Sequence, residues 1–324
     1  MSVMSVTGPV QPSDLGRVLV HEHIVIGANG QELDPTAAPD RREIVAVAVD
    51  QLQKLKDHGV TAIVDPCPIE LGRDPELYAE VSERSGVKVI FATGFYYEAF
   101  GIPPYWRARD PEEIADFYLK ELTDGVGKTG LRPGVIKCAT GNEVHPYERK
   151  CLTGAGMAQK QAGCAIITHT ENSRHGDVQQ DIFEAAGAVM SRVLIGHQDQ
   201  QTSPEPILAL AGRGTFVGID RIGLDFLNSD DVRADNVAAL VKSGFGRHVC
   251  LSHDCVCTLS SPRLPFDIPK DRRPKDNWTF VKGMKPMTHL LTTFLPRLKE
   301  RGVSDADIEV ILRDNPRRLL TGHA

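Results

Sequence analysis

Two histidines separated by one residue stand at the end of a short β-branched run near the start of the chain. The run spans 17–23 and reads RVLVHEH, which places the histidines at His21 and His23. Alternate residues of a strand point to the same face, so both imidazoles are expected to project together, with Glu22 pointing away from them. Two imidazoles converging at the C-terminal end of a strand could bind a metal ion. The alternative is a chance pair of histidines at a strand end.

Four further side chains that could take part in chemistry end or interrupt short apolar runs. They are Lys137 in GVIKCA, His169 in IITHTE, His197 in LIGHQD and Asp254 in CLSHDC. Taken singly, the histidines could be satisfied core residues, Lys137 a surface ion-pair partner and Asp254 a helix cap. An unpaired ammonium inside an apolar run would, however, be costly. Four histidines, one lysine and one aspartate at equivalent positions indicate one site better than six independent accidents.

Short apolar runs alternate with amphipathic segments along the whole chain. The strands are expected at 17–23, 60–64, 87–92, 134–138, 164–168, 192–196, 215–219 and 248–252. The helices are expected at 40–58, 76–84, 110–122, 147–161, 177–186, 204–212, 232–242, 287–301 and 305–313. The helix at 110–122 begins with Asp-Pro-Glu-Glu, which combines an N-cap, a proline in the first position and a glutamate three residues later.

Continuous apolar strands that alternate with helices predict a parallel sheet covered on its outside. Eight such units in 324 residues fit one closed (β/α)8 TIM barrel better than two open sheets. No low-complexity linker divides the chain, so we expect a single domain over 1–324. Active sites of such barrels lie at the C-terminal ends of the strands. All six candidate residues of the preceding paragraphs would lie there.

Composition excludes several classes of partner. The net charge is −6 and no Lys/Arg-rich stripe is present, which argues against nucleic acid. The first residues lack a charged start and a long apolar core, and no run of about 18 apolar residues occurs, so neither a signal peptide nor a membrane span is expected. Seven cysteines without a CxxC pair indicate reduced thiols and a cytoplasmic protein. Cys255 and Cys257 could be metal ligands, but packing thiols are the favoured interpretation.

One connection, from about 255 to about 285, is unusually long and contains Pro262, Pro265, Pro269 and Pro274. A span of this length without secondary structure is usually functional or mobile. Because it follows the last strand, it is expected to be an active-site loop over the barrel mouth. Its aromatic members could form an apolar substrate wall or pack within the loop: Phe266, Trp278 and Phe280.

Taken together, the motifs resemble the phosphotriesterase-like branch of the amidohydrolase superfamily, and most closely its lactonases. The resemblance runs from about Gly16 to Leu320 and is specific because the motifs recur in the family's order. In sequence they are GRVLVHEH, ATGFYYE, GVIKCAT, IITHTEN, VLIGHQD, GIDRIGLD, LSHDC and NPRRLL.

The resemblance implies a binuclear centre of divalent ions. His21 and His23 would join Asp254 on one metal, and His169 and His197 would hold the other. Zinc is the default ion, and iron, cobalt or manganese would suit the same ligands. A hydroxide bridging the metals would attack the substrate, with Asp254 as both ligand and proton acceptor.

Lys137 would bridge both metals as a carbamate made with carbon dioxide. Carbamylation needs a neutral amine, which a desolvated cleft beside cations favours. The modification itself is implied only by the resemblance. The bridging lysine also separates this chain from the mononuclear deaminase branch, which lacks it.

Two residues bear on the substrate. Tyr96 stands in the frame ATG-apolar-Tyr, where lactonases of this family carry a tyrosine near the substrate oxygen, although it could equally be a rim residue. Arg221 matches an arginine at the mouth that orients substrate or joins a proton relay; the alternative is an ion pair with Asp220. The family usually has an aspartate three residues after the strand-six histidine, where this chain has Gln200 and places the acid at Asp199. Either the loop shifts by one residue or the proton shuttle is altered.

The favoured function is therefore a metal-dependent lactonase with weak phosphotriesterase side activity, for which N-acyl homoserine lactones are one candidate substrate. The alternatives are hydrolysis of phosphotriesters, carboxylic esters or amides, and a barrel that binds a small ligand without catalysis. The resemblance also implies a homodimer.

Overall fold

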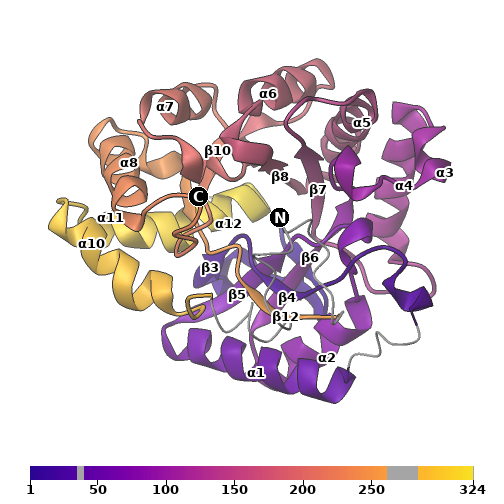
Figure 1. Ribbon diagram of the computed structural model, residues 1–324, viewed down its shortest axis with the longest axis horizontal. Coiled ribbons are helices and arrows are strands. Elements are labelled where there is room, and N and C mark those ends of the chain that lie inside the picture. The colour runs from indigo at the N-terminus through magenta and orange to yellow at the C-terminus, as the bar shows by residue number, and fades with distance from the viewer. Residues whose placement is uncertain (35–39, 261–283, 324) are drawn as a thin grey trace, which may run out of the picture.

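The computed structural model of the protein describes residues 1–34, 40–260 and 284–323 (Figure 1). Most of the predicted long loop, with Phe266, Trp278 and Phe280, lies outside the described residues.

Eight parallel strands form one sheet, and each pairs with the next along the chain. Between the ends of the first and last strands, the N–H of His21 donates to Ser252 Oγ (2.9 Å) and the N–H of Asp254 donates to the His21 carbonyl (3.0 Å). This is the predicted (β/α)8 arrangement. Its strands are β3 (Arg17–Leu19), β5 (Val60–Asp65), β6 (Lys88–Gly94), β7 (Val135–Thr140), β8 (Ala165–Thr170), β9 (Val193–Ile195), β10 (Phe216–Ile219) and β11 (Val249–Leu251).

Helices surround the sheet on its outer side (Figure 1). The caps predicted for two helices are present: Asp40 accepts from the N–H groups of Arg42 and Glu43, and Asp110 forms a capping box with Glu113. The helix predicted at 232–242 begins two residues earlier, because Ser229 is its N-cap. None of the described helices is long and apolar enough to cross a bilayer. They are α1 (Arg41–Asp57), α2 (Pro75–Ser85), α3 (Pro104–Arg107), α4 (Pro111–Asp124), α5 (Pro146–Ala162), α6 (Gly176–Ala185), α7 (Glu205–Gly212), α8 (Asp230–Lys242), α10 (Leu295–Glu300), α11 (Asp305–Glu309) and α12 (Asn315–Thr321), with π-helical turns at Leu290–Phe294 and Val310–Asp314.

The barrel interior is filled at the N-terminal ends of its strands. An antiparallel hairpin of β1 (Val3–Ser5) and β2 (Gly8–Val10), which the sequence pattern did not predict, contributes to this plug together with α12. Because apolar side chains fill this end, an open cavity can form only at the opposite, C-terminal ends of the strands. The plug combines residues from both chain ends with inward-facing strand residues: Val3, Val10, Leu15, Val18, Ala62, Ile167, Leu194, Leu319 and Leu320.

The strand predicted at 17–23 is wrong in extent. β3 ends at Leu19, and His23 begins a separate strand, β4 (His23–Ile26), which pairs in parallel with β12 (Val256–Leu259) outside the barrel sheet. The physical cause is Glu22, whose buried carboxylate accepts the N–H groups of His253 and Cys255 and so ties the chain to the end of β11. The loop predicted from about 255 to about 285 thus begins with a strand, β12, which the sequence pattern did not predict.

Cys255 directly precedes β12, Cys257 is the second residue of that strand, and both are buried. The sulfur of Cys255 lies 3.7 Å from the Lys285 carbonyl, and that of Cys257 lies 3.8 Å from the sulfur of Met287. These contacts agree with packing thiols, the favoured interpretation.

Candidate metal centre and substrate cavity

The six residues predicted to bind metal line one cavity of about 250 Å³ at the C-terminal ends of the barrel strands. They come from β7, β8 and the segments that follow β3, β9 and β11, which the closed barrel brings together. Only Asp254 has appreciable exposure, with 16% of its side chain accessible. Their role as ligands stays a prediction, but their convergence is a property of the structure: His21, His23, Lys137, His169, His197 and Asp254.

Asp254 lies at the centre of the histidines. Its Oδ1 is 3.0 Å from Nε2 of His23 and 3.6 Å from Nε2 of His21, and its Oδ2 is 3.8 Å from Nε2 of His197. Burial opposes ionisation, yet His197, His21 and the nearby Arg221 guanidinium hold the pKa of Asp254 well below its usual range. Asp254 and His197 both have positive φ, 53° and 57°, a conformation that costs non-glycine residues of order 1 kcal/mol. Strained backbone of this kind concentrates at functional sites.

Lys137 projects from β7 into the same cluster. Its Nζ lies 3.3 Å from Nε2 of His21, and the residue is 1% exposed. Burial lowers the pKa of Lys137 to about 8, which increases the fraction of neutral amine that carbamylation requires. The neighbouring strand can approach because it carries Gly94 at φ +138°, where a Cβ would lie 2.0 Å from the Lys137 carbonyl.

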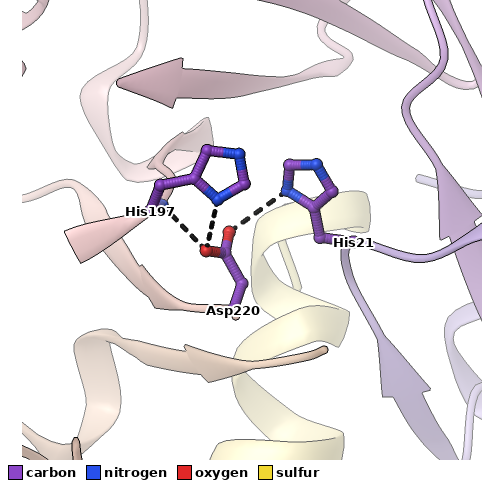
Figure 2. Close-up of side chains that lie close together, drawn as sticks. All are labelled: His21, His197 and Asp220. Carbon is purple, nitrogen blue, oxygen red and sulfur yellow. Dashed lines mark hydrogen bonds and ion pairs between the residues drawn. The ribbon is translucent and has the colours of Figure 1, made fainter. Parts of the chain in front are cut away.

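Asp220, which directly follows β10, holds two of the histidines from behind (Figure 2). One carboxylate oxygen lies 3.2 Å from Nδ1 of His21; the other lies 2.9 Å from Nδ1 of His197 and accepts the His197 N–H at 2.8 Å. Although burial opposes it, these histidines lower the pKa of Asp220 well below its usual range. With Nδ1 engaged by Asp220, each ring leaves Nε2 free for the cavity, which is the arrangement that fixes ligating histidines in metal sites.

The atoms of His21, His197 and Asp220 are close enough together to hold an ion themselves. We instead assign Asp220 to the layer behind the ligands, because both of its oxygens are engaged and it does not line the cavity. Sequence reasoning named Asp220 only as a partner for Arg221. That alternative is wrong: Arg221 Nε donates to Asp254 Oδ2 at 2.9 Å. An aspartate immediately after an apolar strand was the signal available in the sequence.

His169 and Tyr96 form the other side of the cavity. The Tyr96 hydroxyl lies 3.1 Å from Nδ1 of His169, and Nε2 of His169 lies 2.9 Å from Glu171 Oε2. Burial lowers the pKa of His169 to about 4, so this imidazole is neutral near pH 7. A neutral imidazole has one nitrogen lone pair with which to bind a metal.

Four imidazoles, an ionised carboxylate and a buried amine fit divalent ions. Nitrogen and oxygen donors of this kind suit zinc, iron, cobalt and manganese. One subset, the side chains of His21, His23 and Asp254, has all its ligand atoms within 4.8 Å of one another.

Both the sequence and the fold match known proteins. The model of the phosphotriesterase family matches residues 1–320. The chain belongs to the phosphotriesterase family. It is 32% identical to the phosphotriesterase homology protein of Mycobacterium tuberculosis H37Rv, covering 96% of this chain and 95% of that relative. It is 27% identical to the aryldialkylphosphatase of Saccharolobus solfataricus, with 96% and 97% covered.

Among solved structures, a mutant PTE-like lactonase from Deinococcus radiodurans matches with a TM-score of 0.90 at 32% identity. The match covers 98% of this chain and 100% of that chain. The resemblance and the TIM barrel inferred from the sequence are thereby confirmed, and the protein is a hydrolase of the phosphotriesterase family.

This member of the phosphotriesterase family departs from the pattern after His197, where Gln200 replaces an expected aspartate. Asp199 does not substitute for it in the cavity. Its carboxylate accepts the N–H groups of Asp220 and Arg221, both at 3.0 Å, and the buried guanidinium of Arg233 at 3.1 Å. Neither Asp199 nor Gln200 is among the described residues that line the cavity. Asp199 thus positions the backbone that carries Arg221.

Glu70 offers a test of how the segment before the cavity is held. Its Oε2 accepts the N–H of Tyr96 at 3.1 Å, and burial raises the pKa of Glu70 from 4.5 to about 7. A carboxyl with a raised folded pKa stabilises the protein fully below the unfolded pKa, and this contribution is lost as the pH rises through the folded pKa. Wild type should therefore lose about 2–3 kcal/mol of unfolding free energy from this group between about pH 5 and about pH 8. Glu70→Gln cannot titrate, so its unfolding free energy relative to wild type should rise by that amount over the same range.

Urea denaturation at both pH values measures this difference. Glu76→Gln, at an exposed position in the first turn of α2, is the matched control and should show no such trend. A wild-type-to-Glu70→Gln difference that is flat with pH would show that Glu70 does not titrate in this range.

Proposed function

We propose that the protein hydrolyses lactones at this cavity. The observation that carries the proposal is the position of the Tyr96 hydroxyl, which shares the cavity with the six converging residues and lies 3.1 Å from His169. A hydroxyl there can donate a hydrogen bond to an oxygen of a bound ester ring. The likeness to the Deinococcus lactonase supports the same substrate class.

We assign His21, His23 and Asp254 to one divalent ion and His169 and His197 to a second. Carbamylated Lys137 would be shared between them, and zinc is the default ion. When bound, such a pair supplies a water activated at neutral pH and polarises the carbonyl of the substrate.

The protein groups then have separate tasks. Asp254, held ionised by its surroundings, accepts the proton of the attacking water. Arg221 fixes this carboxylate through its contact with Oδ2, leaving Oδ1 directed at His21 and His23. Tyr96 orients the substrate oxygen. Neither Asp199 nor Gln200 lines the cavity, whereas Arg221 does and contacts Asp254 directly, so Arg221 is the neighbour through which this carboxylate is held.

The cavity walls favour an uncharged substrate with an apolar substituent. The Arg221 cation is paired with Asp254, and Lys137 is assigned to the metal centre. Of the other described wall residues, Glu171 carries a carboxylate, and it contacts His169. A neutral acyl chain, as in N-acyl homoserine lactones, would contact the apolar part of the wall without placing a charge there. The apolar residues of the wall are Ile26, Leu71, Leu224, Phe226, Leu227, Val256 and Met284.

The proposal is tested by measuring kcat/KM on zinc-loaded protein for a long-chain N-acyl homoserine lactone, an aryl dialkyl phosphate, an aryl ester and an N-acyl amide. We expect the lactone to lead by about 10²-fold, and Tyr96→Phe to lower the lactone value by about tenfold, the effect of one hydrogen bond of ~1.5 kcal/mol. Tyr105→Phe, an exposed tyrosine elsewhere, is the control. A leading rate on the phosphate, ester or amide would replace the lactone by that substrate class.

A single domain over 1–324, a homodimer and a cytoplasmic location remain predictions from the sequence. They are compatible with the proposed reaction, and the lactonase activity depends on none of them.

A further inference from the structure

His169 is oriented differently from the other histidines of the cavity. His21, His23 and His197 are engaged at Nδ1 by groups behind them and direct Nε2 at Asp254. His169 instead directs Nδ1 at the Tyr96 hydroxyl and Nε2 at a carboxylate. This reversed ring needs its own partner on the Nε2 side.

Glu171 supplies this partner from the turn that follows β8. Its Oε2 lies 2.9 Å from Nε2 of His169, and its side chain is 27% exposed. An ionised carboxylate can only accept a hydrogen bond, so the proton of a neutral His169 must reside on Nε2. Nδ1 then carries the lone pair, and this lone pair faces the cavity.

The surrounding contacts keep both groups in place. The Tyr97 ring stacks on the His169 ring at 5.2 Å with an interplanar angle of 21°, and Gln179 donates to the His169 carbonyl at 2.8 Å. Directly after Glu171, the chain adopts positive φ at Asn172 and Ser173, 53° and 55°. The backbone thus turns sharply at the point that sets the direction of the Glu171 side chain.

We propose that Glu171 is a positioning residue that fixes His169 with the proton on Nε2 and the Nδ1 lone pair in the cavity. The proposal rests on the proposed function in one respect, because His169 is there a ligand of the second divalent ion. Partners of this kind behind a ligating histidine fix its tautomer and strengthen metal binding.

The test compares Glu171→Ala, Glu171→Gln and wild type. The amide oxygen of glutamine can still accept from Nε2–H, so Glu171→Gln separates the hydrogen bond from the charge. Glu143→Gln is the matched control, because it removes one negative charge from an exposed position in the neighbouring loop. Circular dichroism of each variant verifies the fold.

Two readouts are needed. In metal-free protein, ¹⁵N chemical shifts of the histidine rings report the tautomer of His169, with the signal assigned by its loss in His169→Asn. In the second readout, zinc is titrated against a chelating dye to give the number and affinity of bound ions.

Wild type, Glu143→Gln and Glu171→Gln should hold the proton on Nε2 and bind zinc similarly. Glu171→Ala should lose the single tautomer and bind the second zinc ion about 10- to 100-fold more weakly. An unchanged tautomer in Glu171→Ala would overturn the proposal, as would equal losses in Glu171→Gln and Glu171→Ala. Failure of the proposed metal centre is distinguishable, because wild type would then bind fewer than two zinc ions. The tautomer of His169 measured in metal-free protein would still test the role of Glu171.

Discussion

Replacement of Lys137 by alanine is expected to lower kcat/KM by about 10³-fold or more, because the proposed centre would lose the ligand shared between its two ions. The buried Nζ lies 3.3 Å from His21 Nε2. Among the described residues that line the cavity, Lys137 is the one that comes from β7, so no neighbour on that strand can replace it. Bound zinc should fall from two ions to one or fewer per chain. Acetate or propionate should restore part of the activity, since a small carboxylate could take the place of the proposed carbamate.

Plasma emission spectrometry on the dialysed protein, with rates measured at increasing acetate, checks both parts. Lys88→Ala, at an exposed position near the start of β6, controls for the loss of a lysine. A Lys137→Ala protein that kept two ions and full activity would refute the carbamate assignment.

Asp254→Asn is expected to lower kcat by about 10²- to 10⁴-fold, the range typical of a lost general base. The substitution preserves the size of the side chain and one carbonyl oxygen, so the contact with Arg221 Nε can remain and most of the metal should be retained. The amide cannot accept the proton of the attacking water. The loss should therefore appear in kcat more than in metal content.

Parallel measurement of turnover and zinc content distinguishes these effects. Asp225→Asn is the control, because this aspartate lies in the loop of Arg221, is 58% exposed and pairs with the partly exposed Lys285. An unchanged turnover in Asp254→Asn would remove Asp254 from the mechanism.

The hydrogen bonds behind the cavity explain why these substitutions should act locally. Asp220 orients two rings at once, and Asp199 holds the backbone of Asp220 and Arg221. Arg233, completely buried, neutralises Asp199 and also pairs with Asp230. A buried charge of this type is tolerated because each member has hydrogen-bonding partners. The candidate ligands are therefore held by residues of α8 and of the segments that follow β9 and β10, as well as by their own strands.

The sequence by itself determined the order of the elements and the family. Apolar strands such as Val60–Asp65 and Ala165–Thr170 are buried on both faces, and continuous hydrophobic runs of this kind are recognisable without knowledge of their neighbours. The motifs at strand ends located the candidate residues for the same reason, because in a barrel all C-terminal strand ends meet on one face. The break after Leu19 was missed, since it depends on Glu22 binding the end of a strand more than 200 residues away.

Only the tertiary structure decided which residues stand behind the candidate ligands. Asp220 reaches His21 and His197 because β10 lies beside β9 and the barrel brings β3 round to the other side, a relation that no local pattern encodes. Packing likewise fixes three other side-chain directions: Arg221 contacts Asp254, the His169 ring is reversed, and the Asp199 carboxylate binds the backbone N–H of Asp220 instead of lining the cavity. Sequence spacing gives the strand end on which a residue lies, whereas hydrogen bonding among distant segments gives the atom that faces the cavity.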